Sequence, residues 1–324
     1  MGTDPAGRVD AATSSNSRRY RGEVLVVGAY FADLVFQGLS RPVRPGTEVF
    51  ARGFAILPGG AFTPAMAMRR LGHDVVWSTD FGTDLFSEQV LAAASAEGLD
   101  DTGFRMHTVP VRSVTAALSS AEDRAMVSYQ DPVTPYPLAV LLREYRPRLV
   151  ILPQLQYGEG VRAALQVAHR LGTQVFMDCQ DVPCTLDTPT VREILAEVDF
   201  FAPNADEALR LTGAATLDAA VDILAGLVDT VVVKRGSGGA IAVRDGLRCE
   251  IDAVPVDVVD TTAAGDCFDA GFLHAHLTGH SLPDCLATAV ACGAAATTAL
   301  GSSAAPDLTE LPRWLAKVPG ARTI

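Results

Sequence analysis

The stretch VVDTTAAGDCFDAGFLHAHLTGH, residues 258–280, decides how the rest of the chain is interpreted. Its pattern predicts a short apolar strand end, a turn of small residues, and a helix with Phe268 and Phe272 on its apolar side and Gly279 at its end. The first N–H groups of a helix have no partner within it, so a helix that follows small residues can hold a phosphate. Asp266 lies where this helix begins. It either stabilises the helix end electrostatically or accepts a proton beside a bound phosphate.

Apolar runs alternate with helical patterns along most of the chain. EVLVVGAYFADLVF, residues 23–36, opens with the continuous apolar run of a strand buried on both faces. Further strands are predicted at RLVILP, QVFMDCQD, DFFAPN and DTVVVK, with helices between them. This alternation predicts parallel βαβ units in a doubly wound α/β sheet. Because no repeat or interior linker is visible, residues 23–324 are expected to form a single domain.

Two segments outside the alternation, residues 36–57 and 107–130, are predicted to form a small β-sheet. The second contains VRSVTAALSSAEDRAMVSYQ, residues 111–130, whose two alternating runs flank AEDR as in a hairpin. The local pattern fits a plain edge hairpin as well as a lid that covers a site. Both interpretations stay open at this point.

Composition narrows the class of partner and the compartment. The 324 residues carry a formal net charge of −12, which argues against nucleic acid or an anionic membrane as the main partner. Six scattered cysteines without a CxxC pair favour buried thiols in a reducing compartment, so a cytoplasmic protein is expected. Residues 1–22 are polar and small, and we expect a disordered or expression-derived tail.

DTTAAGD followed by CFDAGF resembles the second signature of the PfkB (ribokinase-like) family of carbohydrate kinases. GGAFTPAMAMRRLGHDVVWSTDFGTD resembles that family's first signature, and the resemblance extends over residues 23–312. It implies a ribokinase-like α/β domain in which the small sheet is a lid and often a dimer interface. It also implies ATP-dependent phosphorylation of a small-molecule hydroxyl with Mg²⁺.

The resemblance assigns roles around the transferred phosphate and the acceptor. Asp266 would be the catalytic base, and the backbone of Ala264, Gly265 and Asp266 would form an anion hole. Asp33, the glycine pair Gly59 and Gly60, and more weakly Gln156 would contact the substrate. On local grounds Asp33 could equally be a turn residue, and Gln156 a surface residue. One departure concerns Pro64, which stands where the family usually has a sugar-binding asparagine.

The remaining assignments concern the nucleotide and ions. Asn204 and Glu207, in NADE, are either a capping box or the family's NxxE motif, which holds magnesium largely through water. The other residues assigned to the cofactor are Lys234, Gly236, Gly238 and Ala263. Lys234 departs from the small hydroxyl residue often found there, and the alternative is a lysine that faces solvent. Asp260 and Thr262 match a K⁺ site of several relatives, although the loop at residues 300–303 matches it poorly.

The sequence therefore favours a kinase for a sugar of the ribokinase or fructokinase type. A nucleoside kinase, adenosine-like in its acceptor, is the nearest rival, because Pro64 removes an amide and the apolar rings of Phe31 and Phe62 could face a base. A catalytically silent sugar- or nucleotide-binding relative is a second alternative, and a dehydrogenase is a distant third. The expected partners are a small-molecule substrate and a second copy of the chain at the lid.

Overall fold

The computed structural model describes residues 22–120 and 124–323. Apart from residue 22, the predicted tail lies outside the described residues, as do residues 121–123 of the AEDR turn. Ten strands form the main sheet in the order β14-β13-β12-β11-β10-β9-β8-β1-β4-β5. Its parallel strands are β1 (Val24–Val27), β4 (Val75–Phe81), β5 (Phe104–Met106), β8 (Leu149–Leu152), β9 (Gln174–Asp178), β10 (Phe200–Ala202) and β11 (Thr230–Lys234). An antiparallel edge follows, made of β12 (Ala240–Arg244), β13 (Leu247–Ile251) and β14 (Arg322–Thr323).

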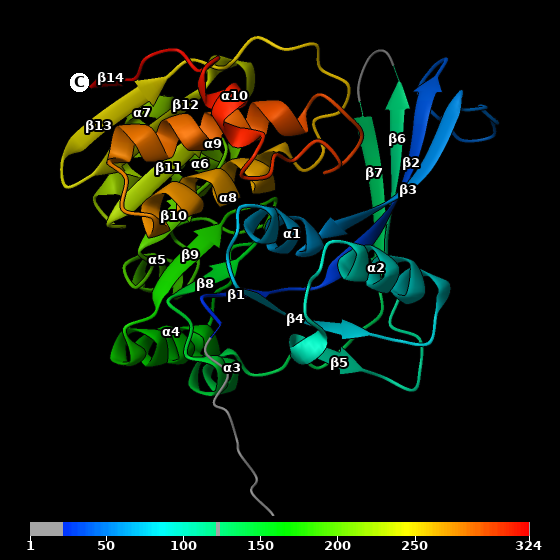
Figure 1. The fold of residues 1–324 in the computed structure, drawn as a ribbon, viewed down its shortest axis with the longest axis horizontal. Helices are drawn as coiled ribbons and strands as arrows, with labels where there is room; N and C mark the ends of the chain where they lie inside the picture. Colours follow the sequence, from blue (N-terminus) through cyan, green and yellow to red (C-terminus); the bar gives the residue numbers. More distant parts are fainter. Residues whose placement is uncertain (1–21, 121–123, 324) are drawn as a thin grey trace, which may run out of the picture.

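Helices cover both faces of this sheet, as the alternation predicts (Figure 1). Along β1, Val24 and Val26 join one hydrophobic core and Leu25 joins the other, because successive side chains of a strand point to opposite faces. The first core takes its helical residues from α1 (Phe62–Arg70), α2 (Leu85–Ala96), α8 (Ala264–Leu277), α9 (Leu282–Ala296) and α10 (Leu311–Leu315). The second takes them from α3 (Leu138–Tyr145), α4 (Glu159–Leu171), α5 (Val191–Leu195), α6 (Ala205–Thr212) and α7 (Leu217–Ala225).

A second sheet of four strands stands beside the main one (Figure 1). Its order is β3 (Gly53–Gly60), β2 (Tyr30–Leu39), β6 (Ser113–Ser120) and β7 (Arg124–Gln130). The predicted hairpin is confirmed, since β6 and β7 pair antiparallel. The buried strand predicted at the start of residues 23–36 is confirmed as β1, but the residues after it are not a turn, because the chain leaves the main sheet after Val27 and enters the second sheet at Tyr30.

The short strand end predicted at the start of residues 258–280 is wrong. Residues 252–263 have no regular structure, and Val258 and Val259 are more than half exposed. After β13 the chain has left the sheet and crosses to the start of α8, so these valines have no strand to pair with. The helix itself is as predicted, with Phe268 and Phe272 buried and Gly279 in the left-handed region just beyond its end.

The six cysteines are buried free thiols. None of the helices in the described ranges combines the length and the apolar character of a membrane span.

Candidate active site

Two neighbouring cavities open where the parallel strands of the main sheet reach their carboxyl ends, the usual ligand position in such sheets. The larger cavity, about 870 Å³, extends from Asn204 and Lys234 to the start of α8. The smaller cavity, about 380 Å³, lies between the ends of β1 and β8 and the inner face of the second sheet. Gln180 lines both cavities, so the two are adjacent.

The start of α8 forms one wall of the larger cavity. Ala263 precedes the helix with φ 68°, a left-handed conformation that turns the chain sharply into it. The Ala264 N–H donates to the Thr261 carbonyl, whereas the Gly265 and Asp266 N–H groups donate to no described residue. Ala264, Gly265 and Asp266 all line the cavity, although Ala263 does not. This turn can therefore bind an anion through its backbone.

Asp266 is the third residue of α8, and this half-buried residue lines the larger cavity. Burial raises its pKa to about 7, because the surrounding protein disfavours the charged form. The negative charges of Asp178 and Asp33 raise this pKa further, whereas the positive charge of Lys234 lowers it. A carboxyl group that titrates near neutral pH beside an anion-binding turn is suited to accept a proton.

Lys234 does not face solvent, so that alternative is wrong. Its side chain is 14% exposed, and its Nζ donates to Asp178 Oδ1 at 2.9 Å and to Asp269 Oδ2 at 3.1 Å. Lys234 also lines the larger cavity. The sequence analysis missed both partners: Asp178 ends β9, and Asp269 lies one turn after Asp266 on α8.

Asn204 and Glu207 form the predicted capping box at the start of α6. Asn204 Oδ1 accepts from the Glu207 N–H at 2.9 Å, and Glu207 Oε2 accepts from the Asn204 N–H at 2.8 Å. Both residues also line the larger cavity, because β10 brings this helix start to the carboxyl edge of the sheet. Burial raises the pKa of the Glu207 carboxyl. The pair therefore caps a helix and at the same time lines the cavity.

The turn after β11 closes the larger cavity. Gly236 and Gly239 line it, whereas Gly238, which the sequence analysis assigned to the cofactor, is not among its lining residues. At Gly239, with φ 82°, a Cβ atom would lie 1.9 Å from the Ile251 carbonyl oxygen, so glycine is required there. The segment after this turn is the strand β12, whereas a helix follows the glycine-rich loop of a dinucleotide site, so this turn is not such a loop.

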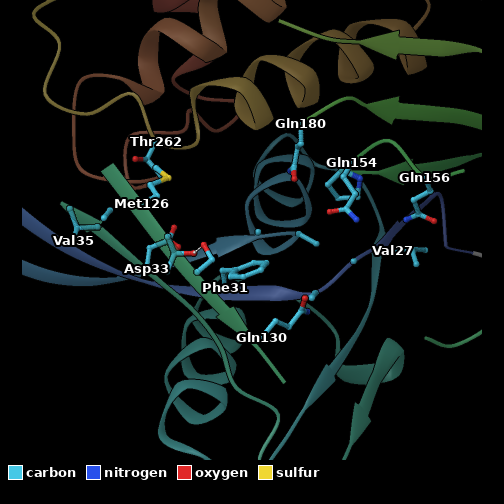
Figure 2. A pocket seen from close by; sticks show the side chains of 18 residues that line it. Val27, Phe31, Asp33, Val35, Met126, Gln130, Gln154, Gln156, Gln180 and Thr262 are labelled. Atoms are coloured by element: carbon cyan, nitrogen blue, oxygen red, sulfur yellow. Dashed lines mark hydrogen bonds between the residues drawn. The ribbon is translucent and has the colours of Figure 1, made fainter. Parts of the chain in front are cut away.

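The smaller cavity combines one carboxylate with several amides. Figure 2 shows Phe31 and Asp33 on the strand β2, with Gln154 and Gln156 across the cavity from them. Asp33 therefore lies in the second sheet and not in a turn beyond β1. Gln180, which the sequence analysis missed, follows β9 with φ 53°, a strained conformation for a residue other than glycine.

The glycine pair fixes the position of Asp33. A Cβ atom on Gly59 would lie 2.3 Å from Asp33 Oδ2, and Gly60 has φ 62°. Gly60 lines the smaller cavity, and Gly59 makes room for the carboxylate that lines it. The predicted substrate residues Asp33, Gly60 and Gln156 thus share one cavity, with Gly59 directly behind it.

Two other residues lie elsewhere than the sequence alone suggested. Phe62 is buried against Trp77 with ring centroids 6.0 Å apart, so it is a core residue and cannot face a ligand base. Pro64 lies in the first turn of α1 and is buried. It lines a small closed void together with Asp178, Asp266 and Asp269 and does not reach the smaller cavity.

Asp260 and Thr262 anchor the loop before α8. Asp260 Oδ1 accepts from the N–H and the hydroxyl of Thr262, at 2.9 and 2.8 Å, and Asp260 Oδ2 accepts from the Gly301 N–H at 2.9 Å. The loop at residues 300–303 is therefore connected to this aspartate. Thr262 also lines the smaller cavity.

Replacing Gly59 by alanine should displace the Asp33 carboxylate, because the new methyl group would overlap its Oδ2 atom. We expect the Kd of a small polar molecule bound in the smaller cavity to rise at least about tenfold, as for the loss of a charged hydrogen bond, while the Kd of a ligand of the larger cavity stays unchanged. Gly53→Ala on the same strand is the control, since its methyl group would meet only Gln37, away from both cavities. Equal Kd values for the ligand of the smaller cavity in the two variants would contradict the role of Gly59 in placing Asp33.

The site thus has two adjacent cavities at the carboxyl edge of the sheet, with a carboxyl group and an anion-binding turn lining the larger one. The model of the pfkB family carbohydrate kinases matches residues 22–308. Ribokinase of Haemophilus influenzae is 26% identical over 91% of this chain and 99% of its own length. Cytidine kinase of Thermococcus kodakarensis is 39% identical over 30% of this chain and 36% of its own.

The structure of Arabidopsis thaliana ribokinase with ribose and ATP superposes with a TM-score of 0.75, at 23% identity, over 91% of this chain and 99% of that one. The chain therefore belongs to the PfkB carbohydrate kinases, and it has the ribokinase-like fold expected from its sequence. It is an ATP-dependent carbohydrate kinase.

Proposed function

We propose that this enzyme transfers the γ-phosphoryl group of ATP to a hydroxyl of a small neutral sugar of the ribose or fructose type. ATP would occupy the larger cavity and the sugar the smaller one. The observation that carries this proposal is the position of Asp266, which lines the larger cavity at the start of α8. Asp33, which lines the smaller cavity, is close enough for its negative charge to raise the pKa of Asp266. Gln180, which lines both cavities, lies where the two ligands would meet.

In this mechanism Asp266 accepts the proton of the attacking hydroxyl. The N–H groups of Gly265 and Asp266 would face the charge that develops on the transferred phosphoryl group, which a preorganised helix start stabilises without reorientation, whereas the Ala264 N–H is already bonded to Thr261. Ala263 sets the turn that aims these groups. Asp33 holds the acceptor by its hydroxyls, supported by Gly59, Gly60 and Gln156.

The nucleotide phosphates would lie against Lys234, Gly236 and Gly239, which line the larger cavity. Asn204 and Glu207 line the same cavity and carry side-chain oxygen atoms that can act as metal ligands. Glu207 uses only Oε2 in its hydrogen bond with the Asn204 N–H, so the pair fits a magnesium ion bound mainly through water. Such an ion, when bound, neutralises phosphate charge. Asp260 and Thr262 also present oxygen atoms, but they are engaged with each other and with Gly301, which fits a structural link better than a K⁺ site.

The lining of the smaller cavity favours an uncharged acceptor. Among its described residues Asp33 is the one charged side chain, and the polar lining otherwise consists of hydroxyl groups and of amides from Gln130, Gln154, Gln156 and Gln180. These groups can bind several sugar hydroxyls, whereas a sugar phosphate or sugar acid would bring a negative charge next to Asp33 without a compensating cation. Closure of the second sheet as a lid would exclude water as a competing acceptor.

A nucleoside kinase is the second candidate. The observations that favour it are the aromatic ring of Phe31 in the smaller cavity and the local similarity to a cytidine kinase. Initial rates with ribose, fructose, adenosine and cytidine, measured side by side at equal concentration, separate the two. We expect the highest kcat/KM with a sugar, and a preference for either nucleoside overturns this choice. Stabilisation by ligands without any turnover would indicate a silent relative.

The pH dependence of the reaction follows from the pKa of Asp266. Burial raises this pKa to about 7, and the carboxyl must be ionised to accept a proton. We therefore expect kcat/KM for the acceptor to rise with pH, to reach half its maximum near pH 7, and to level off about one unit above that. A plateau that already begins near pH 5, where an ordinary exposed aspartate is fully ionised, would contradict the assignment.

We further propose that the second sheet joins two copies of the chain through its outer face. Phe36 and Phe54 pack on that face with ring centroids 5.1 Å apart, and Phe54, Val127 and Tyr129 are each more than half exposed. Such an apolar patch on a sheet usually marks an interface. Val127→Arg should shift the sedimentation coefficient from that of a dimer to that of a monomer. A wild-type protein that sediments as a monomer at micromolar concentration would contradict the proposal.

A further inference from the structure

Lys234 is unusual in this chain both as a residue type and in its position. The chain has 26 Lys and Arg residues, and only Lys234 and Lys317 are lysines. Lys317 lies at the surface, 3.8 Å above the Trp314 ring, whereas Lys234 lies between two buried carboxylates. A compact ammonium with three donors fits between two separate carboxylates, and a planar guanidinium would need more room.

Three carboxylates converge behind the anion-binding turn. Asp266 and Asp269 are three positions apart on α8 and therefore share a side of the helix, and Asp178 reaches them from the end of β9. All three line the small void beside Pro64, which is too small to hold a water molecule, and Asp178 and Asp266 also line the larger cavity. Asp269 Oδ1 is buried and has no hydrogen-bond partner among the described residues, and burial raises the pKa of this carboxyl well above its usual value. The Lys234 ammonium pairs with two of these three carboxyl groups.

The ammonium of Lys234 lies beside the turn that would hold the transferred phosphoryl group, and Lys234 lines the same cavity. A Cβ atom on Gly265 would be 3.6 Å from Lys234 Nζ. The same nitrogen is bound to Asp178 and Asp269, so its position is fixed from both sides. We propose that Lys234 is a positioning residue which neutralises Asp178 and Asp269 behind Asp266 and thereby keeps the base ionised. This inference rests on the proposed role of Asp266.

The charges around Asp266 support this assignment. Asp178 from β9 and Asp33 from β2 favour its protonated form, and Lys234 from β11 favours its ionised form. On its own helix, Asp269 is paired with Lys234, and the neighbouring Cys267 is a thiol whose pKa burial raises well above its usual value, so it stays neutral.

The helices α1 and α9, which pack against α8, contribute little charge near Asp266. Arg70 from α1 and Cys292 from α9 are the groups of those helices that act on the Cys267 thiol, and Arg70 is paired with Glu97. Burial also raises the pKa of Cys292 to about 12, so that thiol carries no charge at neutral pH. Lys234 is therefore the cation whose removal should change the Asp266 carboxyl most.

Two substitutions should move the titration of Asp266 in opposite directions. Lys234→Met removes the opposite charge and should raise the pKa of Asp266 by about one unit or more, and Asp178→Asn removes a like charge and should lower it by a similar amount. In each variant, the rising part of the pH profile of kcat/KM for the acceptor should shift in the same direction as the pKa of Asp266. A purely structural role would lower activity in both variants without shifts of opposite sign.

The titration can be followed directly by ¹³C NMR of the unliganded protein with labelled aspartate carboxyls, in which Asp266→Asn identifies the resonance. Shifts of opposite sign in Lys234→Met and Asp178→Asn, with no shift in the matched surface variant Lys317→Met, support the proposal. An unchanged Asp266 titration in Lys234→Met, or a shift of the same sign in both variants, overturns it. If Lys234→Met does not fold, Asp266 in the Lys234→Met/Asp178→Asn double variant should titrate closer to the wild type than in Asp178→Asn alone, because the two effects oppose each other.

The double variant contradicts the proposal if its Asp266 titrates like that of Asp178→Asn alone, because Lys234 would then contribute nothing. The NMR titration needs no substrate. An absence of phosphate transfer to every acceptor would therefore count against the proposed function, whereas unmoved titrations would count against the role of Lys234.

Discussion

Asp266→Asn should lower kcat by about 10²- to 10⁴-fold, the range that a positioned general base contributes. The substitution removes the proton acceptor but keeps the shape of the side chain and the N–H groups of the turn. The affinity for ATP should therefore stay within about threefold of the wild type, because those N–H groups bind the nucleotide without the carboxylate. Single-turnover phosphate transfer and equilibrium titration with ATP measure the two quantities separately.

The control for this variant tests the simpler interpretation that Asp266 only stabilises a helix end. Asp284 is the third residue of α9, the position that Asp266 has in α8, and it is exposed. Asp284→Asn should change the stability slightly, as a lost helix-dipole interaction does, and leave kcat unchanged. Equal and modest losses of activity in the two variants would mean that Asp266 is a helix-end residue and not the base.

Gly265→Ala should make the protein slightly more stable and at the same time inactivate it. The added Cβ atom meets no protein atom closer than 3.6 Å, and alanine is favoured over glycine in a helix by roughly 0.5–1 kcal/mol. The same methyl group would lie 3.6 Å from Lys234 Nζ, beside the anion-binding turn and between two residues that line the larger cavity. We expect kcat to fall at least about 10²-fold, as when an oxyanion-hole donor is lost, and Tm to stay equal or rise.

Gly160→Ala is the matched control, because Gly160 is the second residue of α4 as Gly265 is of α8, and its Cβ atom would face open space. This variant should gain stability without any loss of kcat. Thermal unfolding and initial rates on both variants suffice for the comparison. A fully active Gly265→Ala enzyme would show that the start of α8 does not approach the transferred group.

The parts of the site that sequence reasoning found are those with a local signature. Asp266 follows small residues at a helix start, and Asn204 and Glu207 have the spacing of a capping box, so the chemistry of a few neighbours predicts their place. The alternation of strands and helices likewise predicts the doubly wound sheet from short segments. In each case the deciding interactions join residues within a few positions of each other.

The parts of the site and the fold that the sequence analysis missed depend on contacts between residues that are distant in the sequence. The Lys234 ion pair with Asp178 joins positions 56 apart, and no local pattern shows which carboxylate a lysine will meet. The sheet change between Val27 and Tyr30 and the burial of Phe62 also depend on the packing of the whole domain. Pro64 illustrates the same limit, because its relation to three carboxylates appears only once α1 and α8 are packed together.

The central claim is that the Asp266 carboxylate receives the proton of the acceptor hydroxyl beside the terminal phosphate of ATP. A crystal structure of the complex with a non-hydrolysable ATP analogue, Mg²⁺ and the preferred acceptor tests it most directly. The account predicts an acceptor hydroxyl oxygen within hydrogen-bond distance of the carboxylate, about 2.6–3.2 Å, and the γ-phosphate at the N–H groups of Gly265 and Asp266. It would be contradicted by an acceptor hydroxyl bound to another base, or by a γ-phosphate held away from the start of α8.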